Sequence, residues 1–195
     1  MRPALARDFY ARPVVEVARD LIGCTVWHGA TAGVIVETEA YHDSEPACHA
    51  FVGLTARTRP LFGEPGRAYV YRSYGIHALL NAVCEPPGVG AAVLIRALEP
   101  LAGIELMRAR RGLEDEHELC SGPGKLAQAL GVTLAENDTS LTSGPIRIER
   151  RAPGWEDPPV LAGTRVGISK AVELPWRFCV EDCRSVSRPR PRRGG

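Results

Sequence analysis

Two glutamates separated by one residue stand out in the stretch VETEAYHDSEPACH, from Val36 to His49. Apolar and polar side chains alternate there, which favours a β-strand. On a strand, Glu37 and Glu39 share one face with Tyr41, and the two carboxylates lie about 7 Å apart. That face is either exposed to solvent, as base rates for carboxylates favour, or it is the wall of a pocket.

Carboxylates at this spacing could hydrolyse a glycosidic bond, since inverting glycosidases hold their carboxyl groups about 6.5–9.5 Å apart. A sugar leaving group needs an acid that protonates its oxygen. An N-alkylated purine is already cationic and leaves without that help, so one carboxylate that activates water is sufficient. The pair Glu37 and Glu39 therefore predicts glycosidic hydrolysis but does not identify the leaving group.

The elements that must position these residues are interspersed strands and helices without a regular βαβ rhythm. A β-hairpin is expected within residues 67–84, turning at Tyr74 and Gly75. We expect one α+β domain, with a largely antiparallel, curved β-sheet core flanked by helices and a protruding β-hairpin. The other expected helices are residues 13–24, 100–112 and 121–131, and the other expected strands are 33–41, 90–100, 145–150, 164–169 and 177–182.

Composition narrows the class of protein. The chain has 195 residues, of which 45% are hydrophobic, enough for one domain with a proper core. No apolar run approaches the ~18 residues of a membrane span, and the N-terminus lacks the apolar region of a signal peptide. The six cysteines include no CxxC pair, which favours reduced thiols in a cytoplasmic protein without a metal.

The basic residues are almost all arginines. The chain has 24 lysines and arginines, and only Lys125 and Lys170 are lysines. Arginines cluster in residues 57–72 and again in the Arg/Pro-rich residues 184–195, which we expect to be a disordered tail. Arginine suits phosphate groups, so this distribution is compatible with a nucleic-acid partner.

Five segments resemble the alkyladenine (3-methyladenine) DNA glycosylase family, in the order expected for it. The similarity extends from about Val14 to Asp182, so residues 1–183 are expected to form one DNA glycosylase domain. The segments are VETEAY, DSEPACHAFVGLTARTRPLF, GRAYVYRSYGIHALLN, VLIRALEP and LCSGPGKLAQALG. The resemblance implies a monofunctional enzyme of base excision repair, which flips alkylated or deaminated purines out of duplex DNA and leaves an abasic site.

The resemblance also implies a role for each matching residue. Glu39 would be the general base that activates water, and Arg96 would help to hold that water and the sugar phosphate. The base would bind between aromatic walls above a polar floor, made by Tyr41, His49, Tyr71 and Asn81. Contacts with DNA outside the pocket would come from Tyr74 as the wedge that fills the gap in the duplex, Ile76 and Lys125.

The resemblance implies no metal and no cofactor, and we expect a monomer whose partner is double-stranded DNA containing damaged purines. Because neither lysine lies in the pocket motifs, no amine is expected to form a Schiff base. Two alternatives remain open at this point. One is a nucleic-acid-binding module without catalysis, which would not require Glu39. The other is a hydrolase of small nucleosides, which would use Glu37 and Glu39 together.

Overall fold

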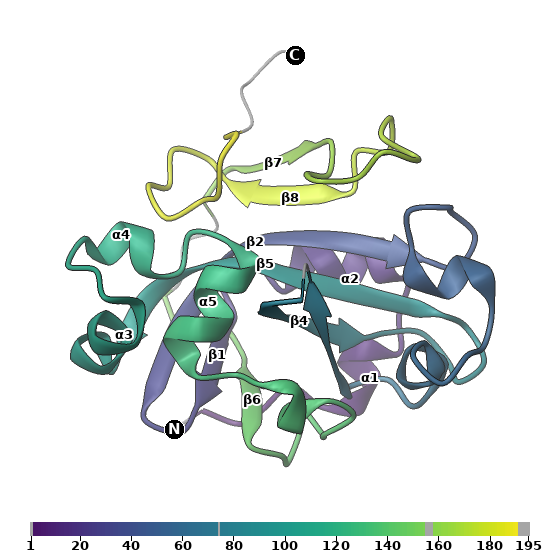
Figure 1. Ribbon diagram of the computed structural model, residues 1–195, viewed down its shortest axis with the longest axis horizontal. Coiled ribbons are helices and arrows are strands. Elements are labelled where there is room, and N and C mark those ends of the chain that lie inside the picture. The colour runs from purple at the N-terminus through teal and green to yellow at the C-terminus, as the bar shows by residue number, and fades with distance from the viewer. Residues whose placement is uncertain (1, 74, 155–157, 191–195) are drawn as a thin grey trace.

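A single curved sheet forms the framework of the protein. The computed structural model describes residues 2–73, 75–154 and 158–190. The sheet has the order β3-β4-β5-β2-β1-β6, while β8 pairs with β2 and β7, and all pairs are antiparallel. Figure 1 shows β7 and β8 above the long strands β2 and β5. The strands are β1 (Thr25–His28), β2 (Thr31–His42), β3 (Ala68–Ser73), β4 (His77–Val83), β5 (Ala91–Ala102), β6 (Ile146–Glu149), β7 (Val160–Gly163) and β8 (Arg177–Val180).

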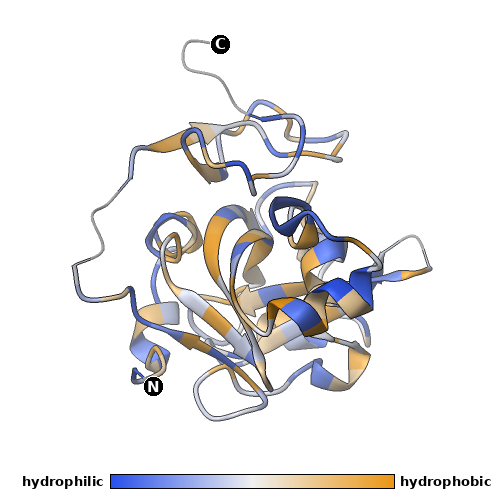
Figure 2. Ribbon diagram, turned by 90° about the vertical axis from the view of Figure 1, so that its left-hand side faces the viewer, coloured by the Kyte–Doolittle hydropathy of each residue, from blue (hydrophilic) through white to orange (hydrophobic). Residues whose placement is uncertain are grey.

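Helices cover the sheet and confirm the expected α+β class. Helix α2 contacts β2 and β5, and α5 contacts β4 and β5. The helices carry both hydrophobic and hydrophilic residues in Figure 2, as expected for elements with one face on the core and one in water. Within the described ranges, none of them is long and apolar enough to cross a membrane. They are α1 (Arg7–Tyr10), α2 (Val14–Asp20), α3 (Ile104–Arg111), α4 (Glu116–Leu119) and α5 (Pro123–Leu130), with 3-10 turns at His49–Val52, Arg59–Phe62 and Leu134–Glu136.

The pairing of β2 with β5 is interrupted where the glutamates lie. Ile35 pairs with Leu98 and Glu37 with Ala97, so Val36 has no partner on β5, and Arg96 is skipped in the same way before the next pair. Such bulges bend a strand and redirect its side chains. Strict alternation would place Val36 on the core face with Ala40 and Ile35 on the opposite face with Glu37. In the structure Ile35 belongs to the main core, and Val36 belongs to a separate small cluster.

Two expected boundaries need correction. Strand β5 does not end at Pro100 but continues to Ala102, so α3 begins later than the sequence pattern indicates. Pro100 pairs with Gly33 at an irregularity in the register, where a proline without an N–H is tolerated. A Cβ atom on Gly33 would lie 2.8 Å from Leu98 Cβ, so only glycine fits. Residues 164–169, expected to be a strand, form a loop instead.

The C-terminal residues are more ordered than their composition suggests. Ser185, Val186 and Ser187 are buried, and Val186 packs against β2, β5 and β8 through its cluster with Val36 and other apolar residues. Residues 185–187 of the expected disordered tail are thus packed on the sheet, whereas residues 188–190 are exposed. The Arg/Pro-rich composition of the tail is typical of disorder, but three small side chains and their hydrogen bonds are enough to fix the segment on the sheet.

Candidate active site

One row of residues across the sheet marks the site. Glu39 on β2 pairs with Leu94 on β5, Leu94 pairs with Asn81 on β4, and Asn81 pairs with Tyr69 on β3. Residues paired in this way project from the same face of a sheet. A cavity of about 610 Å³ lies on this face and is lined by Leu94, Asn81 and Tyr69. Its volume is within the usual range for small-ligand sites.

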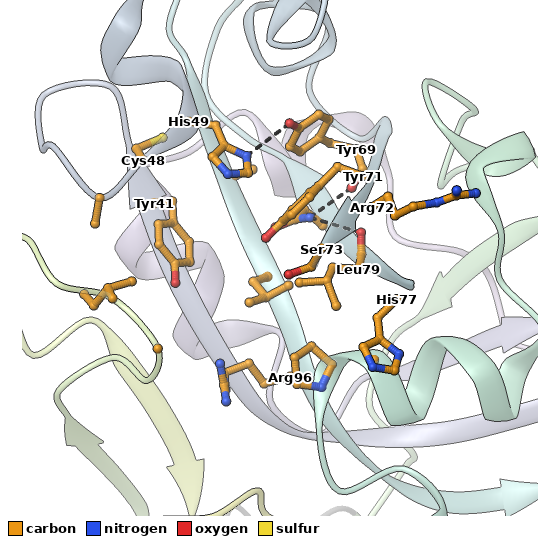
Figure 3. Close-up of a pocket in the computed structure, with 18 of the residues that line it drawn as sticks. Tyr41, Cys48, His49, Tyr69, Tyr71, Arg72, Ser73, His77, Leu79 and Arg96 are labelled. Carbon is orange, nitrogen blue, oxygen red and sulfur yellow. Dashed lines mark hydrogen bonds between the residues drawn. The ribbon is translucent and has the colours of Figure 1, made fainter. Parts of the chain in front are cut away.

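Aromatic side chains form the walls of the cavity. Figure 3 shows Tyr41 on one side of it, with His49 and Tyr71 opposite. His49 meets Tyr71 edge to face with 4.6 Å between the ring centroids, and Tyr71 stacks on Tyr69 at 5.4 Å. His49 Nδ1 lies 3.2 Å from the Tyr69 hydroxyl. Three of the residues expected to hold a base therefore surround one space.

The walls have no net charge at neutral pH. Burial raises the pKa of Tyr41, and the charge of Glu39 raises it further. Burial also raises the pKa of Tyr71, to about 12. Burial and then the charge of Arg57 lower the pKa of His49. The imidazole is therefore neutral at pH 7 and presents an uncharged surface to a ligand.

Glu39 lies directly behind the wall of the cavity. Its side chain has no exposed surface, which excludes the solvent-exposed alternative for Glu39. Glu39 Oε2 accepts hydrogen bonds from the Tyr41 hydroxyl at 2.8 Å and from Arg96 at 3.2 Å, and Oε1 accepts one from the Val166 N–H at 2.7 Å. All three donor residues line the cavity. The carboxylate is thus separated from the cavity only by the residues that donate to it.

Glu37 is held quite differently. Its Oε1 accepts from Arg96 at 3.0 Å, from Arg177 at 2.7 Å and from the Ser187 hydroxyl at 2.9 Å, and its Oε2 accepts from the Ser187 N–H at 2.8 Å. A carboxylate offers about four lone-pair positions. Glu37 therefore receives three hydrogen bonds on Oε1 and one on Oε2, mostly from residues outside the cavity lining. Glu39 receives two on Oε2 and one on Oε1, all from residues that line the cavity, and Oε1 can accept one more.

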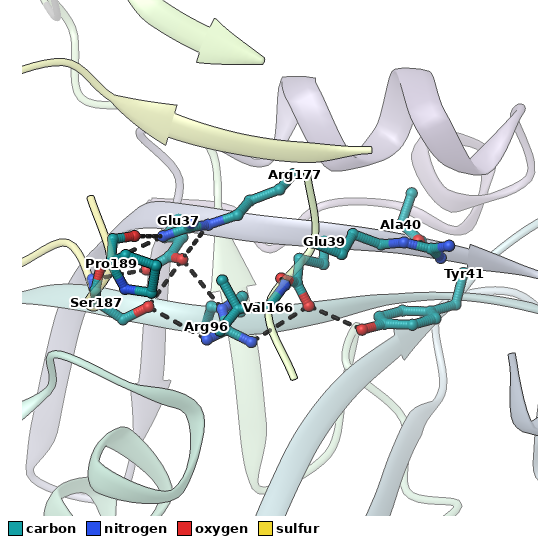
Figure 4. A network of polar contacts seen from close by, with 10 residues as sticks. Glu37, Glu39, Ala40, Tyr41, Arg96, Val166, Arg177, Ser187 and Pro189 are labelled. Carbon is teal, nitrogen blue, oxygen red and sulfur yellow. Dashed lines mark hydrogen bonds and ion pairs between the residues drawn. The ribbon is translucent and has the colours of Figure 1, made fainter. Parts of the chain in front are cut away.

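Arg96 connects the two carboxylates (Figure 4). Its Nε donates to Glu37, its Nη1 to Glu39 and its Nη2 to the Ser187 hydroxyl at 3.2 Å. Burial opposes the charge on Arg96, but the charges of Glu39 and then Glu37 outweigh it and raise the pKa. The guanidinium is therefore a fixed, permanently charged donor at the edge of the cavity.

The other residues with expected roles are more dispersed. Asn81 is buried at the cavity wall, where its amide donates to the backbone carbonyls of Tyr69 and Leu79. Lys125 lines a neighbouring hollow and forms an ion pair with Glu118 at 2.7 Å. Ile76 is 75% exposed and lies outside the main cavity. Tyr74, the expected wedge, lies outside the described residues.

Several residues of the site have no assignment from the sequence. Tyr69 could have been found, because it alternates with Tyr71 on β3. Arg165 could not, since it belongs to a loop. Its guanidinium lies 4.7 Å from the Tyr41 ring centroid and forms two hydrogen bonds with Glu45, at 2.6 and 3.0 Å. Arg165 therefore packs against the ring of Tyr41 and supports that side of the cavity.

The described part of the chain contains no group of three or more histidine, cysteine, aspartate or glutamate side chains that could hold a metal ion. The chemistry available is that of one carboxylate with a free acceptor position, a fixed guanidinium and an aromatic slot. This set suits attack by water on a carbon atom that is bonded to a planar group, while the planar group is held between aromatic rings.

Known proteins resemble this chain over almost its whole length. A family model described as methylpurine-DNA glycosylase matches residues 8–184. A Rhodopseudomonas palustris protein is 55% identical over 190 residues, which cover 97% of this chain and 91% of the relative. A Methanoculleus marisnigri protein is 50% identical over 189 residues, covering 94% of this chain and 98% of the relative. Both relatives are provisionally named 3-methyladenine DNA glycosylases.

Proposed function

The chain belongs to the methylpurine-DNA glycosylase family, which makes it a hydrolytic DNA glycosylase, and from this premise we propose how its site works. The substrate is duplex DNA containing an alkylated or deaminated purine. The enzyme flips that nucleotide into the aromatic slot and hydrolyses the N-glycosidic bond with water activated by Glu39. The product is an abasic site, the first intermediate of base excision repair.

The shape of the cavity supports base flipping. A base inside a duplex cannot reach a slot whose walls are Tyr41 on one side and His49 and Tyr71 on the other, so the nucleotide has to leave the stack. Each stacked base gains about 1–3 kcal/mol from an aromatic face. A cationic alkylpurine gains further from the ring quadrupole. The fixed amide of Asn81 meets the edge of the base and discriminates among purines.

The main support for Glu39 as the general base is its environment. It is a buried carboxylate with one acceptor position left, directly behind three residues that line the cavity. Once the side chains in front of Glu39 move aside, a water from the cavity beside Arg96 and Val166 would fill that position. It would give its proton to Glu39 while attacking C1′ of the sugar, as the bond from C1′ to the purine breaks. The same negative charge would stabilise the oxocarbenium-like transition state.

Water, rather than an amine, is the proposed nucleophile. Neither Lys125 nor Lys170 lines the cavity, and Lys125 is engaged by Glu118. A Schiff base would need an uncharged amine at the sugar. We therefore propose a monofunctional enzyme that does not cut the DNA backbone. A nucleoside hydrolase that uses both glutamates is disfavoured, because Arg177 and Ser187, which bind Glu37, do not line the cavity, whereas all three donors to Glu39 do.

The proposed function is tested by incubating the protein with methylated duplex DNA and separating the released bases by chromatography. We expect free 3-methyladenine or 7-methylguanine and an unbroken backbone with abasic sites. Affinity for the duplex should fall steeply as salt is raised, because binding releases counterions from the phosphates. Release from free nucleosides as fast as from DNA, or binding that does not respond to salt, would support the nucleoside hydrolase instead.

The neutral state of His49 predicts a dependence on pH that differs between lesions. Because burial and Arg57 lower the pKa of His49, its ring stays neutral at pH 7 and protonates only below the ordinary value of about 6.5. A protonated ring would repel a cationic base but not a neutral one. The ratio of single-turnover rates for 7-methylguanine over hypoxanthine should therefore fall as pH drops from 7 to 5.

The control for this prediction is His49→Asn, which removes the titrating ring. Taking the ratio of the two rates cancels any effect of pH that both substrates share. In the variant, the ratio should change less between pH 7 and pH 5 than in the wild type. Parallel curves for the two proteins would show that His49 does not sense the charge of the base.

A further inference from the structure

Residues near the C-terminus complete the polar network behind the cavity. Ser187 is 4% exposed, and its hydroxyl donates to Glu37 at 2.9 Å while it accepts from Arg96 at 3.2 Å. Its backbone is fixed as well, because the Ser187 N–H donates to Glu37 and its carbonyl accepts from Arg177 at 3.2 Å. Figure 4 shows this serine beside Glu37, with dashed lines to Glu37 and to the Arg96 guanidinium.

The hydroxyl of Ser187 accepts one of the three hydrogen bonds that hold the Arg96 guanidinium. All three nitrogens of the guanidinium donate a hydrogen bond, and the bond from Nη2, one of the two terminal nitrogens, goes to Ser187. Without it, Nε and Nη1 still meet carboxylates, but the plane of the group is no longer set by a third contact. Hydrogen bonds weaken steeply when donors tilt. The bond most sensitive to such a tilt is the one from Nη1 to Glu39, already 3.2 Å long.

We propose that Ser187 is a positioning residue for the glycosylase reaction, acting through Arg96 on the carboxylate of Glu39. The inference rests on the proposed function, since it concerns the geometry of the proposed base. It gives the C-terminal segment a role in catalysis without contact with the substrate. Small misplacements of a catalytic group lower rates strongly, so a lost hydroxyl at this distance should be measurable.

The test compares two serines of the same segment. Ser187→Ala removes the hydroxyl and keeps the backbone contacts with Glu37 and Arg177. Ser185→Ala is the matched control, because Ser185 is fully buried too, but its hydroxyl meets His117 at 3.5 Å rather than the glutamates. With enzyme in excess over a duplex carrying one damaged purine, Ser187→Ala should slow base release about five- to tenfold, the scale of one hydrogen bond.

A positioning role predicts a split between rate and binding. The affinity of Ser187→Ala for a duplex with an abasic site should equal that of the control variant, while its rate of base release falls. In a Glu39→Gln background the same substitution should have no further effect on the residual rate, because Ser187 would act through Glu39. Ser187→Cys, which keeps a weak donor of similar shape, should release bases at an intermediate rate.

The possible outcomes separate this inference from the proposed function. If the wild type releases no base, the proposed function falls and the inference falls with it. If the wild type is active but Ser187→Ala matches Ser185→Ala in rate, only the inference is overturned. Two other outcomes would also overturn the inference. In the first, Ser187→Ala slows base release and weakens DNA binding to the same extent. In the second, Ser187→Ala slows base release as strongly in the Glu39→Gln background as in the wild type. In either case Ser187 would be a general structural residue.

Discussion

Replacing Glu39 with glutamine should slow base release by about 10²–10⁴-fold, the usual contribution of a general base. Glutamine has the same size and can still accept from the Val166 N–H, but it cannot take a proton from water. Arg96 keeps its ion pair with Glu37, so the fold should persist. The measurement is the single-turnover rate on an alkylated duplex with enzyme in excess, followed by chromatography of the released base.

The control for this variant is the same substitution at Glu64, an exposed residue paired with Arg7. Glu64→Gln should release bases at the wild-type rate. Glu39→Gln should still bind a duplex containing an abasic site as tightly as the wild type. If Glu39→Gln released bases within about threefold of the wild-type rate, Glu39 would not be the general base, and the activity would need another carboxylate.

Replacing Glu37 with glutamine should instead reduce stability, by about 3–5 kcal/mol, the cost of removing one partner of a buried charge pair. Arg96 and Arg177 both bond to Glu37 Oε1, and their side chains are only 8% and 4% exposed. Without the carboxylate, two buried guanidinium groups compete for Glu39 and neutral acceptors. The measurement is the free energy of unfolding from urea denaturation, provided that one cooperative transition is seen.

Glu64→Gln serves again as the matched control. The pair of Glu64 with Arg7 has an N–O distance of 2.8 Å, close to the 2.7 Å between Glu37 and Arg177, but it is exposed to solvent. Surface pairs contribute at most about 1 kcal/mol. Equal unfolding free energies for Glu37→Gln and Glu64→Gln would contradict the view that the buried network stabilises the fold.

The sequence predicts the local part of this site well. Alternation along β2 places Glu37, Glu39 and Tyr41 on one face, and the motif similarity selects the residues that meet in the cavity: Tyr41, His49, Tyr71, Asn81 and Arg96. The hairpin and the antiparallel sheet follow from residue patterns that act over a few positions. These features depend on interactions between near neighbours or on motifs whose spacing is visible in the chain.

Burial of the two glutamates could not be predicted, because it depends on residues far away in the sequence. The contacts of Glu37 with Arg177 and Ser187 span 140 and 150 residues. Base rates therefore favoured solvent for two carboxylates that are fully buried. The packing of residues 185–187 was missed for the same reason, since their composition resembles a flexible tail and the contacts of Val186 lie on β2, β5 and β8.

These long-range contacts also determine when the enzyme can become active during its synthesis. Chains leave the ribosome from the N-terminus at roughly 5–20 residues per second. Glu39 and most of the aromatic slot emerge well before Arg177 and Ser187. A nascent chain therefore carries its proposed base long before the network behind it can close, because Ser187 lies 150 residues beyond Glu37.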